Sequence, residues 1–277
     1  MRLSFLKCLI AMTIVSGLSA CVPDASLIEA GVVEAPQPKL VSGAYVARQD
    51  GPFAIPAIPV EKVPVSYQRQ EVYFPSEDAP GTIIINTAQR TLHLVTGSNK
   101  AIRYGIAVGK AGFEWSGEAL ITDRKNWPTW TPPPEMIARK PELAKWEKGQ
   151  PGGLTNPLGA RALYLTTNGV DYGYRIHGTP EWNSIGSNAS SGCIRMINQD
   201  VIDLFERAPN GTKVVVLNRD GSRPTGLTLP PPAPKKPKPV AVSTKPAPVA
   251  PTVEPAMPAL PEPPPLDLEL TAAAAIQ

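Results

Sequence analysis

Two residues that can form a nucleophile and its base lie close together in the second half of the chain. His177 stands in IHGTPEW, and Cys193 follows sixteen positions later in SSGCIRM. A cysteine attacks as its thiolate, and a neighbouring imidazole is the usual group that takes the proton near neutral pH. Gly192 permits unusual backbone dihedrals, so that the N–H groups of Gly192 and Cys193 suit an oxyanion hole. Arg195 adds a positive charge that suits a substrate carboxylate. The pattern predicts acyl transfer through a cysteine, against the alternative of a buried, inert cysteine.

The start of the chain accounts for the other two of its three cysteines. A basic start and a short apolar stretch are typical of a secretory signal peptide, here expected over residues 1–20. Cys21 follows Leu-Ser-Ala, which resembles the bacterial lipobox, and we expect it to be lipidated; ordinary cleavage after Ala20 is the alternative. Val22, rather than an aspartate, favours the outer membrane. The expected protein is periplasmic and lipid-anchored, and no second cysteine remains to form a disulfide with Cys193.

Composition divides the chain into a folded middle and two proline-rich flanks. Residues 220–277 lack aromatic residues, histidine and cysteine and hold nearly half of the 34 prolines, so we expect a disordered tail. Residues 21–75 are expected to form a tether from the lipid, with a short ordered piece near 67–74. The predicted folded domain is 76–219, a normal size for one domain. The net charge of +3 is too small to indicate a nucleic-acid partner.

Strands are expected to position the candidate residues, because short β-type runs dominate the middle of the chain. A β-branched run at 82–86 and an alternating run at 90–95 flank a turn-length connection, which predicts a hairpin. Other runs of the same kind predict further strands at 102–108, 119–122, 162–165, 174–177 and 213–217. Helical patterns occur at 134–139 and 198–206. The expected fold class is mainly β, a sandwich or distorted barrel with a few short helices.

The motifs resemble those of the L,D-transpeptidase family with its YkuD-type catalytic domain. That family has a histidine-glycine pair, a spacer, and then Ser/Thr-His-Gly-Cys with a hydrophobic residue and Arg or Asn. His177-Gly178-Thr179 and Ser190-Ser191-Gly192-Cys193-Ile194-Arg195 follow this order. The flanks NPLGARALYL and PTWTPPPEM also agree, and the resemblance covers roughly 81–217. The family fold is a β-rich, sandwich-like domain, in agreement with the strand pattern.

The resemblance implies a role for each candidate residue at the reacting centre. Cys193 would be the nucleophile and His177 the general base and acid, with the carbonyl of Gly178 orienting the imidazole. Ser191 stands where the family often has a second histidine that supports the oxyanion region, and its hydroxyl would donate a weaker hydrogen bond there. Gly192 would contribute to the oxyanion hole. The family needs no metal ion and no organic cofactor.

The resemblance also implies a substrate class and leaves the acyl acceptor open. Peptidoglycan stem peptides would donate the acyl group, and Arg195, Arg175, Tyr174 and Trp182 are the candidate residues for binding them. An amine of a second stem would give a 3→3 crosslink. Water would make the enzyme an L,D-carboxypeptidase, and a lysine of an outer-membrane protein would make it a wall-anchoring enzyme. A wall-binding lipoprotein without activity is the alternative from another class.

Overall fold

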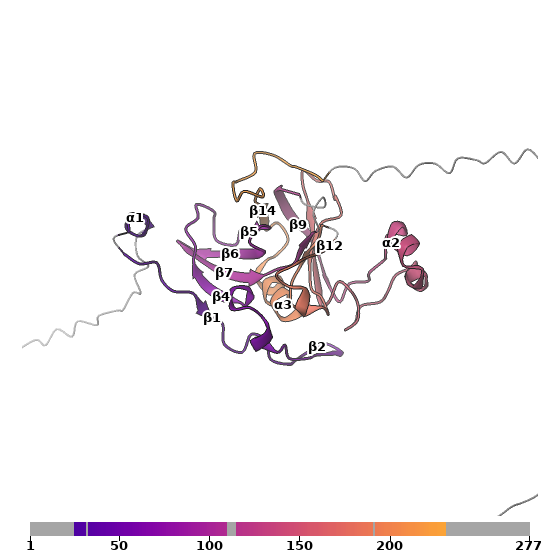
Figure 1. The fold of residues 1–277 in the computed structure, drawn as a ribbon. Helices are drawn as coiled ribbons and strands as arrows, with labels where there is room; N and C mark the ends of the chain where they lie inside the picture. The colour runs from indigo at the N-terminus through magenta and orange to yellow at the C-terminus, as the bar shows by residue number, and fades with distance from the viewer. Residues whose placement is uncertain (1–24, 32, 110–114, 191, 231–277) are drawn as a thin grey trace, which may run out of the picture. The chain divides into compact units, whose positions relative to one another are not determined.

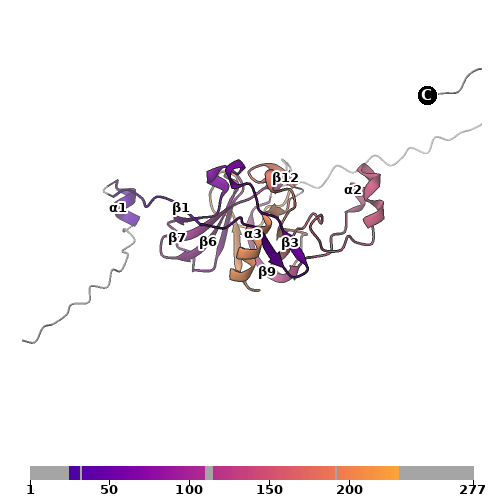
Figure 2. The same ribbon diagram turned by 90° about the horizontal axis from the view of Figure 1, so that it is seen from below.

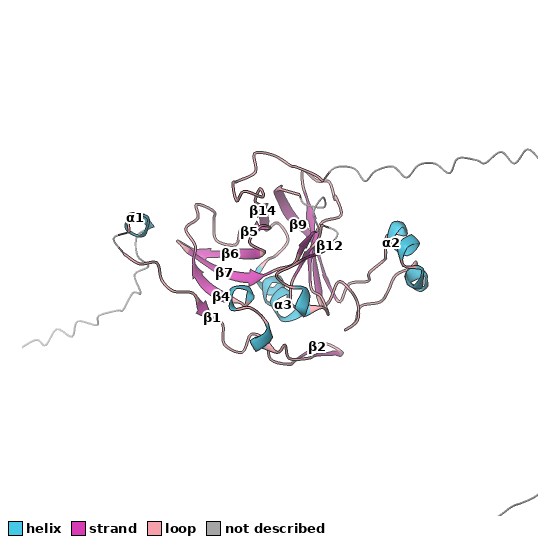
Figure 3. Cartoon of the chain, in the orientation of Figure 1, coloured by secondary structure: helices cyan, strands magenta, loops and turns pink. Residues whose placement is uncertain are grey.

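A computed structural model describes residues 25–230 of the chain, apart from residues 32, 110–114 and 191 (Figure 1). Strands dominate the described part, and the helices are few and short (Figure 3). The α-helices are α1 (Ala25–Glu29), α2 (Pro134–Arg139) and α3 (Asn198–Arg207), and the 3-10 helices are η1 (Val60–Lys62), η2 (Val65–Tyr67), η3 (Pro141–Trp146) and η4 (Trp182–Ser184). The predicted mainly β fold class is confirmed.

The main sheet has ten strands in the order β1-β4-β7-β6-β5-β14-β9-β10-β11-β13. Their bounds are β1 (Lys39–Leu40), β4 (Gln70–Tyr73), β5 (Ile83–Asn86), β6 (Thr91–Gly97), β7 (Lys100–Gly105), β9 (Gly117–Asn126), β10 (Arg161–Thr166), β11 (Arg175–His177), β13 (Ile194–Arg195) and β14 (Lys213–Val216). Two pairs, β5 with β14 and β11 with β13, are parallel, and the other neighbours are antiparallel. Two small sheets join β2 (Arg48–Asp50) to β3 (Phe53–Ile55) and β8 (Val108–Gly109) to β12 (Asn188–Ser190).

The hairpin predicted near the start of the domain and the helix predicted near its end are confirmed. Strands β5 and β6 pair antiparallel, with Ile85 opposite Leu92, and both side chains are fully buried. Because side chains alternate along a strand, Ile84 lies on the other face of the sheet, in a small cluster with Val95 and Val215. Helix α3 buries Val201 in the main core, as its apolar spacing predicts.

The N-terminal flank is ordered over a longer stretch than the sequence predicted. Residues 39–73, here called the N-terminal strap, add β1 and β4 to the main sheet and form the β2–β3 hairpin. Tyr45 and Val63 of the strap pack into a buried cluster with Ile197, and Ile55 packs against Ile202 of α3. Figure 2 shows β3 beside α3. The strap is therefore built into the domain, which differs from the expected tether with one short ordered piece.

The C-terminal boundary also lies later than the expected position at 219. Thr228 exchanges two main-chain hydrogen bonds with Ser116, of 3.1 and 2.8 Å. Leu227 packs against the main core, and Arg223 forms an ion pair with Asp78. Residues up to Thr228 thus belong to the folded domain. Most of the expected tail, the signal peptide and Cys21 lie outside the described residues.

Among the helices that the structure describes, none has the length and apolar composition of a membrane span.

Candidate active site

Two neighbouring parallel strands bring the candidate residues together. Strand β11 ends in His177, and β13 begins one residue after Cys193; Ile176 pairs with Ile194, and His177 pairs with Arg195. Ile176 and Ile194 are buried in the main core. Strand alternation therefore directs His177 and Arg195 to the opposite face of the sheet. The expectation that His177 ends a strand is confirmed.

His177 is oriented by the carbonyl group that follows it in the chain. Its Nδ1 lies 2.6 Å from the oxygen of Gly178, and the residue is 4% exposed. A carbonyl oxygen can only accept, so Nδ1 carries the proton and Nε2 keeps its lone pair. Burial lowers the pKa of His177 to about 4, although the hydrogen bond to Gly178 opposes the shift. The charges of Arg195 and Arg175 lower the same pKa further. The imidazole is therefore neutral near pH 7 and able to accept a proton at Nε2.

Cys193 lies beside the start of β11. Its Sγ is 3.7 Å from the oxygen of Gly173, and the residue is half-buried. Burial raises the pKa of the Cys193 thiol, while a main-chain hydrogen bond at Arg175 and the charges of Arg175 and Arg195 lower it. The net direction is upward, so the sulfur carries its proton near neutral pH. A thiol beside a neutral imidazole can lose its proton as it attacks.

The glycine before Cys193 has the backbone conformation that the sequence suggested. Gly192 has φ +110°, in a region that side chains with a Cβ rarely adopt. Residue 191 lies outside the described part of the chain, and the prediction for Ser191 stays a prediction.

Two arginines lower the pKa of the Cys193 thiol by their charge, and each is already paired with a carboxylate. Arg175 binds Asp171 through two hydrogen bonds of 2.7 and 2.8 Å, and its guanidinium lies 4.3 Å from the centre of the Tyr164 ring. Arg195 contacts Glu181 at 3.0 Å, and the Glu181 side chain is 67% exposed. An anionic substrate would compete with these two carboxylates for the guanidinium groups.

The aromatic candidates are held mainly by packing. Tyr174 stacks on Trp115 with 4.5 Å between ring centres, and it packs against the main core. Burial, and then the charge of a Cys193 thiolate, raise the pKa of Tyr174. Trp182, in η4, packs against the cluster around Ile185 and Ile197. Roles of Tyr174 and Trp182 in substrate binding stay predictions.

Several residues that support this geometry were not found from the sequence. Asp171 holds Arg175 and also accepts a hydrogen bond of 2.8 Å from the N–H of Gly173. Its spacing of four residues from Arg175 was the available signal, but that spacing is informative in helices and this segment is irregular. Asn198 contacts the backbone behind His177, and nothing local marks it.

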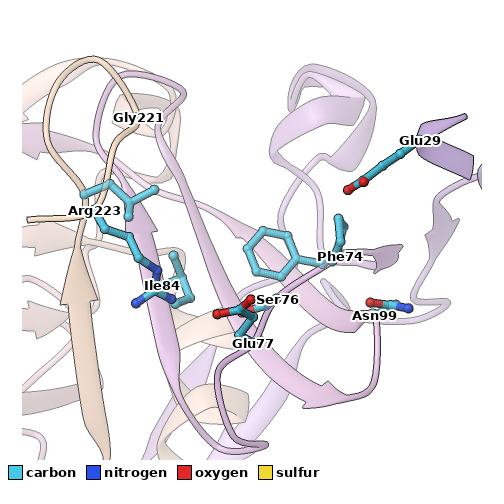
Figure 4. A pocket seen from close by; sticks show the side chains of 10 residues that line it. Glu29, Phe74, Ser76, Glu77, Ile84, Asn99, Gly221 and Arg223 are labelled. Atoms are coloured by element: carbon cyan, nitrogen blue, oxygen red, sulfur yellow. The ribbon is translucent and has the colours of Figure 1, made fainter. Parts of the chain in front are cut away.

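A pocket of about 510 Å³ lies apart from these residues (Figure 4). Its lining includes Phe74, Ile84 and Leu217, and neither His177 nor Cys193 belongs to it. Within the described ranges, no group of three or more histidine, cysteine, aspartate or glutamate side chains is arranged to hold a metal ion.

Comparison with known proteins gives the family. Residues 80–216 match the YkuD family model, described as the L,D-transpeptidase catalytic domain. "Putative L,D-transpeptidase YqjB" of Bacillus subtilis (strain 168) is 32% identical over 142 residues, which cover 50% of this chain and 73% of that protein. The chain belongs to the L,D-transpeptidase family. Members of this family are peptidoglycan-modifying transferases.

Two other similar proteins match about half of this chain. "Probable L,D-transpeptidase YcfS" of Escherichia coli (strain K12) is 35% identical over 161 residues, which cover 55% of this chain and 50% of that protein. The chain thus spans about half the length of this L,D-transpeptidase. A crystal structure from Brucella melitensis, titled a probable carnitine operon oxidoreductase, is 48% identical, covers 56% of this chain and 96% of its own, and has a TM-score of 0.39.

Proposed function

We propose that this L,D-transpeptidase acts on peptidoglycan stem peptides through a Cys193 acyl-enzyme. The observation that carries the proposal is the 2.6 Å contact between His177 Nδ1 and the Gly178 carbonyl, next to the strand that follows Cys193. That contact leaves Nε2 as the basic atom of His177, and the strand paired with the end of β11 begins one residue after Cys193. A nucleophile, a base and a third group that orients the base are the recurring parts of acyl-transfer sites, and Cys193, His177 and the Gly178 carbonyl supply them here.

The first half-reaction moves one proton and breaks one amide bond. His177 Nε2 takes the proton of the Cys193 thiol as the sulfur attacks the carbonyl between the third stem residue and the terminal D-alanine. N–H groups at Gly192 and Cys193 are suited to the oxygen of the tetrahedral intermediate. The imidazolium then gives its proton to the D-alanine nitrogen. D-Alanine leaves, and the stem remains as a thioester on Cys193.

The second half-reaction regenerates the thiol. An amine of a second stem attacks the thioester, His177 takes the amine proton, and the sulfur leaves with a proton from the imidazolium. The product is a 3→3 crosslink. Stem peptides carry carboxylates, and the two guanidinium groups of Arg175 and Arg195 beside Cys193 suit them once Asp171 and Glu181 are displaced.

The test of the nucleophile uses the full chain with Cys8→Ser and Cys21→Ser, so that Cys193 is its only cysteine. Incubation with a carbapenem, whose ring carbonyl resembles the scissile amide, should add one carbapenem to the intact mass. The adduct should be absent in Cys193→Ala and weak in Cys193→Ser, because a hydroxyl has a far higher pKa than a thiol. A wild type without adduct and without tetrapeptide cleavage would favour the wall-binding lipoprotein instead.

The acceptor is tested on cell wall after overexpression of the protein. Digested wall should contain more 3→3 crosslinked dimers, which supports the stem amine. Shortened stems without new dimers would indicate water as the acceptor and an L,D-carboxypeptidase. Stem fragments linked to lysines of an outer-membrane protein would indicate wall anchoring.

We also propose that the protein is periplasmic and attached to the outer membrane through a lipid on Cys21. The Leu-Ser-Ala-Cys sequence after a short apolar stretch supports this location. Palmitate labelling of cells should mark the wild type and be lost in Cys21→Ser. Label that persists in Cys21→Ser would contradict the anchor without affecting the proposed chemistry.

A further inference from the structure

Asn198 lies behind the catalytic histidine and has no evident role in its own helix. It is the first residue of α3, and the residue that precedes the helix, Ile197, makes no side-chain capping bond. Asparagine is a weak helix former away from the capping position. The Asn198 residue is 8% exposed, and its Oδ1 accepts a hydrogen bond of 2.9 Å from the N–H of Ala160. Its amide is therefore committed to a contact outside the helix.

The same oxygen lies directly against Gly178. A Cβ built on Gly178 would be 2.3 Å from Asn198 Oδ1, a distance at which atoms overlap. A Cβ built on Gly159, whose φ is +62°, would also be 2.3 Å from that oxygen and 2.5 Å from the carbonyl carbon of Gly178. The main chain at Gly178 is thus in close contact with Asn198 and Gly159. Its N–H donates a hydrogen bond of 3.0 Å to the oxygen of Arg161.

These contacts restrict the orientation of the Gly178 peptide group. The carbonyl oxygen of Gly178 accepts from His177 Nδ1 at 2.6 Å, so its direction decides which ring nitrogen carries the proton. If the peptide group turned, Nδ1 would lose its acceptor, and the proton would be shared between Nδ1 and Nε2. Only the form with Nε2 unprotonated can take the proton of Cys193.

We propose that Asn198 is a positioning residue for His177: by holding Gly178 in place it maintains the Nδ1–H form of the imidazole. The proposal rests on the proposed function, because it assigns His177 as the base. Asn198 touches neither the substrate nor the reacting atoms; it acts through the backbone of Gly178.

The test has a readout that is independent of activity. The chain has two histidines, so a full-length protein with ¹⁵N-labelled histidine gives few imidazole signals, and His93 serves as an internal reference. In the wild type, the ¹⁵N chemical shift of His177 Nδ1 should be that of a protonated ring nitrogen, and the ¹⁵N chemical shift of Nε2 should be that of an unprotonated one. In Asn198→Ala both shifts should move toward the average of the two forms, while those of His93 stay unchanged.

Kinetics of carbapenem acylation provide the second measurement. Asn198→Ala should lower the maximal acylation rate about 10- to 100-fold, as small misplacements of catalytic groups do, with the half-saturating concentration changed less than about twofold. Gln68→Ala is the matched control, because Gln68 is another buried amide, bonded to the carbonyls of Val60 and Val63. It should lower thermal stability and leave the acylation rate and the His177 shifts unchanged.

A conservative variant covers the case in which Asn198→Ala does not fold. Asn198→Asp keeps an acceptor oxygen, and an acidic residue is favourable in the first turn of a helix. It should keep the Nδ1–H form of His177. The proposal is overturned if Asn198→Ala retains the wild-type shifts and rate, if Gln68→Ala loses as much rate, or if Asn198→Asp shows the averaged shifts. A wild type that is not acylated at all would overturn the proposed function, and the shifts would still test the positioning.

Discussion

Burial shifts the pKa values of His177 and Cys193 in opposite directions, and both shifts favour the uncharged form of the side chain. It lowers the pKa of the imidazole to about 4 and raises the pKa of the thiol, so both groups are uncharged near neutral pH. A resting pair of this kind differs from the thiolate–imidazolium pair of strongly activated cysteines. In the proposed periplasmic location an uncharged thiol would also resist oxidation, since the thiolate is the form that oxidants attack.

The pH dependence of acylation follows from the pKa of His177. The base must be unprotonated, and its pKa is depressed, so the rate should be constant from about pH 5 to pH 8 and should fall as the pH drops through about 4. An acid limb near 6.5, the ordinary histidine pKa, would contradict the burial argument. His93 also has a pKa of about 4 because of burial, so the profile should be measured in His93→Gln as well. The acid limb of the rate profile should remain near pH 4 in His93→Gln, because the limb belongs to His177.

The two histidines should separate activity from stability. His177→Ala should lower the acylation rate on the order of 10² to 10⁴, as the loss of a positioned base does. His93 is buried and stacks on Phe74 at 4.3 Å, so His93→Ala should instead lower the melting temperature and leave the acylation rate near that of the wild type. Equal losses of activity in both variants would mean that the base is not His177.

The sequence indicated His177 and Cys193 as candidates because histidine and cysteine are rare in the chain and because a glycine adjoins each of the two residues. It could not locate Asn198 or Asp171. Asn198 acts across 38 residues on Ala160, and such a contact exists only after α3 packs behind β10 and β11. The residues proposed to do the chemistry leave local patterns, whereas the contacts that hold them in place depend on the tertiary fold.

At the scale of elements, the N-terminal strap supports the strands that hold the site. Asp50 binds Arg161, the first residue of β10, through two hydrogen bonds of 2.7 Å, and it also accepts from the Trp127 indole at 2.8 Å. Arg69 binds Asp200 of α3 at 2.9 Å. Asp50 and Arg161 are 111 residues apart in the chain, and Arg69 and Asp200 are 131 residues apart. The strands β1, β2 and β3 have only two or three residues each, so they leave little local pattern. Composition alone therefore gave the wrong extent of the folded part.

Asp50→Asn should measure how much the strap contributes to stability. It removes the charge from a largely buried ion pair, with side-chain exposures of 14% and 10%, and should lower the free energy of unfolding by about 2 to 3 kcal/mol. Asp123→Asn is the matched control, because its pair with Lys125 is 53% exposed on both sides and should contribute less than about 1 kcal/mol. Urea unfolding of both variants gives the two values, and equal values would show that the strap is not held through Asp50.

The same pair gives a pH dependence of known sign. Arg161 lowers the pKa of Asp50 below its ordinary value of 3.8. The stabilisation is therefore present above about pH 4 and is lost as the pH falls through the lowered pKa. The difference in unfolding free energy between the wild type and Asp50→Asn should shrink in that range.

At the scale of the whole molecule, the family match and the folded unit do not coincide. The match covers residues 80–216, whereas ordered structure begins before the strap and continues through Thr228. The strand pattern predicted the sheet within the match, because alternating and β-branched runs are local signals. Outside the match, single contacts such as those of Asp50 and Leu227 attach proline-rich segments to the domain, and composition does not reveal them.

The C-terminal boundary can be placed by truncation. A chain that ends at Pro230 should have a melting temperature within about 2 °C of the full chain if residues 231–277 add nothing to the domain. A chain that ends at Arg219 loses the packing of Leu227 on the core, the Thr228–Ser116 hydrogen bonds and the Arg223–Asp78 ion pair. Together these should lower its melting temperature by about 5 to 10 °C.

Two leucines near the boundary make the same test with single substitutions. Leu227 packs against the core beside Gly117, where its Cδ1 would be 3.1 Å from an added Cβ, whereas Leu229 is 42% exposed. Leu227→Ala should lower the unfolding free energy by about 1 to 2 kcal/mol, and Leu229→Ala should change it by less than about 0.5 kcal/mol. If both substitutions are neutral and the chain ending at Arg219 melts with the full chain, the domain ends at β14 as the sequence first indicated. A loss of unfolding free energy in Leu227→Ala but not in Leu229→Ala would place the boundary after Thr228. The two leucines can differ in this way only if the segment that holds Leu227 is folded onto the domain.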